Sequence, residues 1–168
     1  MERIIKNRNR QLLQQHVGTA DPQPRLCNCR PRDRANCPLQ GKCQMKGVVY
    51  KATVSSPSTS EEWFYIGLTA NTFKTRYNQH THSFRHKTDT GTELSKKVWE
   101  LKDKGLQHKI TWKVITRGQP YRPGQRFCDL CATEKLAIIR NSNNKRMLNQ
   151  RTELIRACMH KFPYKIKI

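Results

Sequence analysis

The sequence predicts a small α+β domain, in which an antiparallel sheet of about three strands is flanked by helices and preceded by a cysteine-rich zinc knuckle. Strand-like and helix-like segments follow the order strand, strand, helix, helix, strand, helix, helix, with no internal repeat. Four cysteines fall within residues 27–43, where hydrophobic periodicity is almost absent, so cross-linking would have to give this segment a fixed shape. A chain of 168 residues suffices for one such domain with a modest extension.

The polar composition of residues 1–26 predicts a linker or N-terminal extension, with one helical piece over 4–16. The zinc knuckle would occupy 27–46. The main domain would follow over 47–160, closed by a second cysteine and histidine cluster, and 161–168 would form a C-terminal tail.

Three strands are predicted from β-branched and alternating residues. The first covers 48–54 and the second 63–68, and the stretch SSPSTSEE between them predicts a hairpin with a long loop. The third covers 110–116 and precedes the turn-rich basic loop RGQPYRPGQR.

Helix boundaries follow from capping residues. Asn71 is predicted to cap a helix that carries Arg76 and His80 on one polar face, because the two are four residues apart. A second helix is predicted between Thr92 as cap and Gly105 as stop. The last two helices are predicted over 129–140 and 151–160.

The chain is strongly basic, with 33 Lys and Arg against 12 Asp and Glu and a formal charge of +21. Such a charge repels itself unless a polyanion binds, so nucleic acid is the expected partner. No apolar run approaches the roughly 20 residues that cross a bilayer, and the N-terminus lacks the apolar stretch of a secretory signal. We therefore expect an intracellular, reducing location, in the nucleus, and no membrane partner.

Two tyrosines, Tyr50 and Tyr65, fall on the adjacent strands of the predicted hairpin, and Arg76 and His80 follow on the next helix. Taken alone, a strand tyrosine usually packs in a core and a helix arginine usually faces solvent. In combination, Gly47-Val48-Val49-Tyr50 and Tyr65-Ile66-Gly67 resemble the two half-motifs of the GIY-YIG nucleases, although GVVY has one residue more than Gly-Ile-Tyr.

The resemblance is closest to the endonucleases of Penelope-like retroelements. It is carried by the phrases CPLQGKC, FYIGLTANTFKTRYNQH, TELSKKVWELKDKG, FCDLCATEKLAII and LNQRTELIRACMH, which cover residues 27 to 160. It implies a GIY-YIG nuclease-like fold and a site made of six residues in this order: Tyr50, Tyr65, Arg76, His80, Glu134 and Asn149.

By this resemblance the chain would hydrolyse phosphodiester bonds of DNA with the help of Mg²⁺. Glu134 would hold the ion, and Arg76 would neutralise the scissile phosphate through its forked donors. A salt bridge to a nearby lysine is the alternative for Glu134, which the pattern places in an otherwise apolar helix stripe. Glu93 and Glu100 are expected to be solvated.

The general base stays open between Tyr50 and His80. A free phenol has a pKa of about 10, so Tyr50 would need the surrounding positive charge to lower it, whereas His80 titrates near neutrality. Tyr65 would position the phosphate or the base. For Asn149, a structural hydrogen bond is as consistent with the sequence as a catalytic role.

The cysteines predict two structural zinc ions. Cys27, Cys29, Cys37 and Cys43 offer thiolates for one tetrahedral site. A second set would clamp the third predicted helix to the last, and it consists of Cys128, Cys131, Cys158 and His160.

Other ligand partitions remain open. Cys37 and Cys43 could join two histidines among His82, His86 and His108, and the resemblance suggests such a Cys2His2 finger just upstream of the nuclease core. Cys128 and Cys131 could instead be buried apolar residues or a thiol redox pair.

The predicted function is a Mg²⁺-dependent DNA nickase whose nick primes target-primed reverse transcription, with a companion or fused reverse transcriptase and its template RNA as partners. A noncatalytic, zinc-dependent nucleic-acid-binding module is the alternative, for which the charge and the cysteines suffice. A thiol oxidoreductase is a third, weaker hypothesis.

Overall fold

A computed structural model describes residues 27–88, 90–119, 121–122, 125 and 127–158. β1 (Val48–Ser56) is the central strand of a three-stranded antiparallel sheet, with β2 (Glu61–Thr69) and β3 (Lys109–Arg117) on its two sides. The predicted α+β class, with an antiparallel sheet flanked by helices, is therefore confirmed. The helical piece predicted over 4–16 lies outside the described residues.

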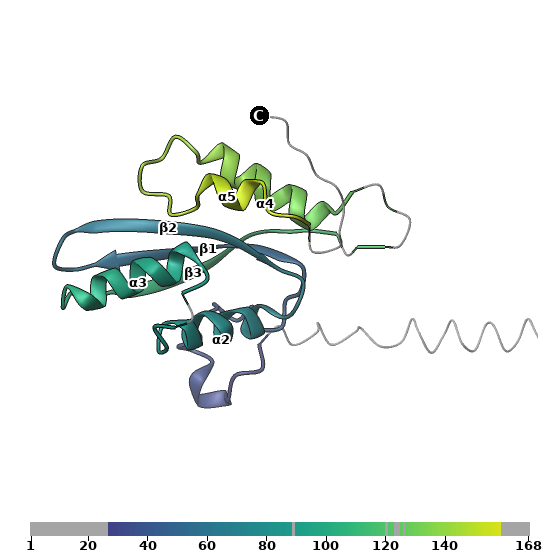
Figure 1. The fold of residues 1–168 in the computed structure, drawn as a ribbon. Coiled ribbons are helices and arrows are strands. Elements are labelled where there is room, and N and C mark those ends of the chain that lie inside the picture. The colour runs from purple at the N-terminus through teal and green to yellow at the C-terminus, as the bar shows by residue number, and fades with distance from the viewer. Residues whose placement is uncertain (1–26, 89, 120, 123–124, 126, 159–168) are drawn as a thin grey trace, which may run out of the picture.

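Helices cover both faces of the sheet (Figure 1). α2 (Phe73–Ser83) and α3 (Glu93–Asp103) pack on the face to which β1 turns Tyr50, Ala52 and Val54. α4 (Asp129–Arg140) and the short α5 (Arg151–Leu154) lie over the opposite face. Because successive side chains of a strand point to opposite faces, β1 contributes to both cores.

The cysteine-rich segment packs against the α2 side of the domain and contains a 3-10 turn, η1 (Pro31–Asp33). Leu39 and Cys43 are only 2% and 1% exposed, and they belong to the same core as Tyr50 and Phe73. Segment and sheet therefore share one hydrophobic core.

The hairpin differs from its prediction. Both strands run further than expected, pairing from Val48 with Thr69 as far as Ser56 with Glu61, so four residues connect them instead of a long loop. Ser60 adopts a positive φ of 53° in this turn. Glu61 and Glu62, expected in the loop, are exposed at the end of β2, whereas Ser56 at the end of β1 is only 2% exposed. The third strand and the helix over 129–140 are confirmed, the strand with one more residue at each end.

Helix starts and stops agree with the sequence in part. Thr92 caps α3 by accepting a hydrogen bond from the Ser95 backbone N–H, and Gly105 stops it at a φ of 66°. The prediction of Asn71 as cap of α2 is wrong: Thr72 takes that role, accepting from the Thr75 backbone N–H at 3.2 Å.

The last helix is much shorter than predicted. α5 ends at Leu154, and residues 155–158 leave the helix and bring Cys158 back against α4. Among the described residues, none of the helices has the length and apolar composition needed to cross a lipid bilayer.

Candidate functional site

Tyr50, Arg76 and His80 form one hydrogen-bonded chain between β1 and α2. The Tyr50 hydroxyl lies 2.7 Å from His80 Nε2, and Arg76 Nε donates to the same hydroxyl at 3.1 Å. Tyr50 is fully buried and His80 is 2% exposed, both packed against Trp112. The four-residue spacing of Arg76 and His80 is what brings both to one tyrosine.

Burial governs how these groups titrate. It lowers the pKa of His80 to about 3, with a smaller contribution from Arg76, so the imidazole is neutral and can accept the tyrosine proton at Nε2. Burial also raises the pKa of Tyr50 to about 12, although the Arg76 charge opposes this. The expectation that cationic neighbours lower the pKa of Tyr50 is therefore wrong for this state, because desolvation outweighs one arginine.

The packing around Gly67 explains why the second half-motif, Tyr65-Ile66-Gly67, ends in glycine. It lies opposite Tyr50 in the β1–β2 register, and a Cβ at this position would come within 2.6 Å of the Tyr50 hydroxyl and 2.8 Å of Tyr65 Cε1. Both rings are buried and have no room to retreat, so only glycine fits between them.

A cavity of about 570 Å³ opens beside this chain, between the end of β2, α2, α4 and the segment after α5. Tyr50 and His80 are not among its lining residues. They contact two residues that are, because the Tyr50 hydroxyl accepts from Arg76 and the His80 ring packs against Tyr65. The polar and charged side chains that line the cavity include Tyr65, Arg76, Gln79, Glu134, Lys135 and Glu153.

Glu134 lines this cavity, and it lies one helical turn from Leu130 and Ile138, which are only 4% and 2% exposed. Leu136 and Ile139, on another side of α4, are 52% and 43% exposed, so the apolar stripe around Glu134 is narrower than expected. Burial, and next the charge of Glu153, raise the pKa of Glu134 to about 7, against opposing effects of Arg156 and Lys135. No ion pair joins Glu134 to a basic side chain within the part of the chain that the structure describes, which counts against the salt-bridge alternative.

Asn149 has a structural position. Its amide bridges β2 by accepting from the Ile66 N–H and donating to the Ile66 carbonyl, both at 2.7 Å, and it donates to Glu153 at 2.8 Å. Asn149 does not line the cavity, whereas Glu153 does. Of the five other predicted site residues, three line the cavity, and Tyr50 and His80 connect to Arg76 behind it. Asn149 instead holds β2 in position beside the cavity.

Glu153 is the site residue that the sequence did not predict. Besides Asn149, it accepts from the Gln150 backbone N–H at 3.2 Å. Burial raises the pKa of Glu153, although Asn149, Gln150 and the Tyr65 side chain oppose this. The pair Gln150 and Glu153 forms the capping box of α5. That spacing is visible in the sequence as a helix start, but nothing local shows that it faces Glu134.

The four cysteines of the knuckle converge. The Sγ atoms of Cys27, Cys29, Cys37 and Cys43 lie within 4.8 Å of one another, and five of their pairs are 3.3 to 3.9 Å apart. A tetrahedral Zn²⁺ with Zn–S bonds of about 2.3 Å would separate its sulfurs by about 3.8 Å. The set is therefore compatible with zinc, and no described histidine joins it, unlike in the mixed alternative.

A second thiol cluster joins the start of α4 to the chain after α5. Cys128, Cys131 and Cys158 are all buried, with Cys131 Sγ and Cys158 Sγ 3.4 Å apart, and the three thiols are compatible with zinc. The fourth predicted ligand, His160, lies outside the described residues. Cys131 and Cys158 also line the cavity of Glu134, so this cluster helps to shape it.

The knuckle caps the helix that carries Arg76. The Phe73 N–H donates to the Met45 carbonyl at 2.8 Å, and the Lys74 N–H donates to the Cys43 carbonyl at 2.9 Å. The first N–H groups of a helix have no partner within the helix. The thiol cluster therefore holds the α2 N-terminus and, through it, the position of Arg76.

Comparisons with protein-family models, with curated proteins and with solved structures found no match for this chain.

Proposed function

We propose that the chain is a divalent-cation-dependent DNA endonuclease with a GIY-YIG-type active site, the nuclease part of a Penelope-like retroelement protein. The observation that carries the proposal is the convergence of the half-motif tyrosines, Arg76, His80 and Glu134 on one place. These residues come from two strands and two helices, and spacing alone does not require them to meet.

The cavity suits a phosphodiester. Arg76 uses Nε on Tyr50 and Nη1 on Gln79, which leaves further donors of its planar guanidinium for phosphate oxygens. Lys135 and Arg156 add positive charge at the same cavity. Arg76 would thus bind the scissile phosphate and neutralise charge that develops on it during hydrolysis.

Glu134 and Glu153 offer carboxylate oxygens, the donor type that Mg²⁺ prefers. When bound, Mg²⁺ would neutralise phosphate charge and lower the pKa of a coordinated water. Glu134 must first lose its proton, and its pKa of about 7 places that step near neutral pH. Glu153 would assist mainly by holding the Asn149 side chain in place.

Tyr50 and His80 act from behind the cavity in this state. The chain from Arg76 through the Tyr50 hydroxyl to His80 Nε2 fixes the orientation of the guanidinium. Proton acceptance by Tyr50, which the family resemblance implies, would require the phenol to come into contact with the cavity. In our proposal both residues position Arg76.

The zinc-compatible clusters would act structurally, one by capping α2 and the other by attaching the segment after α5 to α4. The nick would supply a 3′ end to a companion reverse transcriptase with its template RNA, in the nucleus.

A noncatalytic nucleic-acid-binding module is the second candidate. It is favoured by the aromatic packing of Tyr50 and His80, whose rings contact Phe73 and Trp112 as ordinary core residues do. In that case the tyrosine pair would serve the core alone.

The test is nicking of supercoiled plasmid with and without MgCl₂. Wild-type protein should nick only with Mg²⁺, and Glu134→Gln should abolish nicking while DNA binding and zinc content stay unchanged. Glu100→Gln is the matched control, since Glu100 lies on α3 in surface ion pairs with Lys97 and Lys104. Nicking by Glu134→Gln at the wild-type rate would refute the site, and a wild-type chain that binds DNA without nicking it would favour the second candidate.

A further inference from the structure

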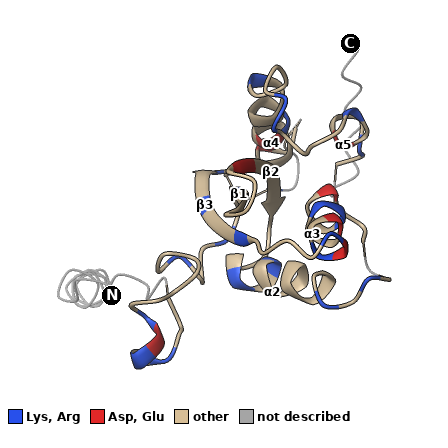
Figure 2. Cartoon of the chain, turned by 90° about the vertical axis from the view of Figure 1, so that its left-hand side faces the viewer, with Lys and Arg blue, Asp and Glu red and all other residues tan. Residues whose placement is uncertain are grey.

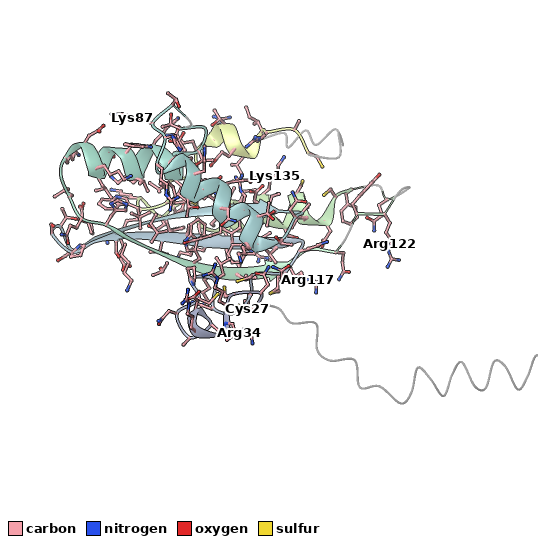
Figure 3. The ribbon with its side chains drawn as sticks, turned by 90° about the horizontal axis from the view of Figure 1, so that it is seen from below. Cys27, Arg34, Lys87, Arg117, Arg122 and Lys135 are labelled. Carbon is pink, nitrogen blue, oxygen red and sulfur yellow. The ribbon has the colours of Figure 1, made fainter. Side chains whose placement is uncertain are left out.

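The outer face of β3 is open and basic. β3 is an edge strand of the sheet, and along it Lys109, Thr111, Lys113 and Arg117 are exposed, while Trp112 points into the core. Figure 2 shows β3 at the left edge of the sheet, and Figure 3 shows Arg117 on the side of the sheet where the knuckle lies.

The central strand extends this face. Lys51 lies directly opposite Lys113, and Thr53 lies opposite Thr111, so their side chains point to the same side of the sheet. On this side α4 packs over β2 and β1. The register shift of the β1–β3 pairing places Arg117 opposite Val48, so Arg117 points to the other side of the sheet, and its Nε donates to the Lys46 carbonyl. We name Lys51, Lys109 and Lys113 together the basic strand face.

No ion pair among the described residues neutralises this charge. The ion pairs of the described residues all lie elsewhere, on η1 and around α3, and none includes a residue of the basic strand face. Like charges placed directly opposite each other across strands destabilise a sheet. Lys51 turns its Nζ over the Phe64 ring, at 4.1 Å from the centroid, but the Lys113 charge stays exposed.

The spacing of the charges suits a phosphate backbone. Lys109 and Lys113 are four residues apart on the same face, which is about 13 Å along a strand. This distance is close to the width of about 12 Å of the B-DNA major groove, so neighbouring basic side chains can reach phosphates on its two sides. The intervening Thr111 adds a hydroxyl donor.

We propose that the basic strand face binds the sugar–phosphate backbone of duplex DNA, as a contact surface separate from the cavity. The cavity lies at the β2 end of the sheet and the basic strand face lies at the opposite edge. This inference rests on the proposed function for the choice of DNA as ligand. It adds an anchoring surface that carries no base readout.

Protection of an edge strand is the competing explanation, because exposed lysines discourage edge-to-edge pairing between chains. The two explanations differ in what they predict. A DNA contact predicts a change in the salt dependence of binding, whereas edge protection predicts a change in association state.

The experiment compares two double variants with equal net charge. Lys109→Gln/Lys113→Gln removes two charges from the basic strand face, and Lys96→Gln/Lys104→Gln removes two from α3, where both lysines pair with glutamates. Affinity for a 40-base-pair duplex is measured without Mg²⁺ over a range of salt concentrations. Sedimentation of each variant reports its association state.

The β3 variant should lose affinity about tenfold at 0.1 M salt, and its slope of log affinity against log salt should fall by about 1.8, because each lost phosphate contact removes about 0.9. The α3 variant should keep the wild-type slope. Equal slope changes in both variants would reduce the effect to net charge and overturn the proposal. An unchanged slope with self-association would assign the lysines to edge protection, and an unchanged slope with weaker binding to phosphatidylserine vesicles would assign them to a lipid surface. Plasmid nicking by wild type and Glu134→Gln tests the proposed nuclease activity, and the salt slopes test the basic strand face. Because binding is measured without Mg²⁺, either proposal can fail while the other holds.

Discussion

Replacing Glu134 by glutamine should stabilise the protein in the absence of magnesium, by an amount that depends on pH. The pKa of Glu134 is raised from 4.5 to about 7, mainly by burial. Each unit of pKa difference corresponds to about 1.4 kcal/mol, so the charged carboxylate costs at most about 3–4 kcal/mol at pH 8. Because the side chain is partly exposed and solvent screens it, we expect about 1–2 kcal/mol.

The sign of the pH dependence follows from the direction of the pKa change. The folded state keeps the proton of Glu134 more tightly than the unfolded state, so wild-type stability should fall, relative to the glutamine variant, as pH rises from about 4.5 to 7. Above pH 8 the difference should be constant. Urea unfolding of the zinc-loaded proteins at pH 5, 6, 7 and 8 measures it.

Glu100→Gln should have the opposite effect on the stability of the folded protein. Hydrogen bonds from Lys104 and Lys97 lower the pKa of Glu100, so this carboxylate should stabilise the folded protein above pH 5, by less than about 1 kcal/mol for an exposed pair. Added Mg²⁺ should stabilise the wild type at pH 8, by about 1.4 kcal/mol at tenfold excess over its dissociation constant, and leave Glu134→Gln unchanged. Equal stability of wild type and Glu134→Gln at every pH would refute the reasoning from burial.

Three further predictions concern the framework of the site. Gly67→Ala should destabilise the protein by about 3 kcal/mol in urea unfolding, because its Cβ would come within 2.8 Å of buried tyrosine atoms, whereas Gly91→Ala, with nothing within 4 Å, should be neutral. Asn149→Ala should cost about 3 kcal/mol and abolish nicking, because it leaves two buried backbone groups of β2 without partners, and a cost below about 0.5 kcal/mol would contradict that role. Elemental analysis should find two zinc atoms in the wild type and one each in Cys37→Ser and Cys158→Ser, so an unchanged zinc content in either variant would reject that cluster as a metal site.

The sequence predicted the framework well where the signals were local. Alternation defined β3, and Thr92 and Gly105 marked the two ends of α3, because capping and positive φ depend on one or two residues. The cysteine spacing predicted the knuckle for the same reason. Asn71 and Thr72 are neighbours of equally good capping type, and only the backbone conformation shows that Thr72 caps α2.

Long-range packing limited the rest. The sequence could not show that Leu136 and Ile139 face outward, since helical periodicity does not tell which side of α4 meets the sheet. Glu153 was not predicted because its place opposite Glu134 depends on how the segment after α4 returns to β2. The burial that sets the pKa of Tyr50 is likewise a property of the assembled core.

The clamp between Asn149 and Ile66 joins residues 83 positions apart in the chain. A hairpin such as β1–β2 forms within microseconds, whereas contacts of such separation form late, because the loop between them must close first. The β1–β2 hairpin and α2, which carries Arg76, depend on local contacts and can therefore form while Glu134 and Glu153 are still undocked. The proposed cutting activity would then require the segment after α4 to be docked, and local opening of this segment would disable it without unfolding the β1–β2 hairpin.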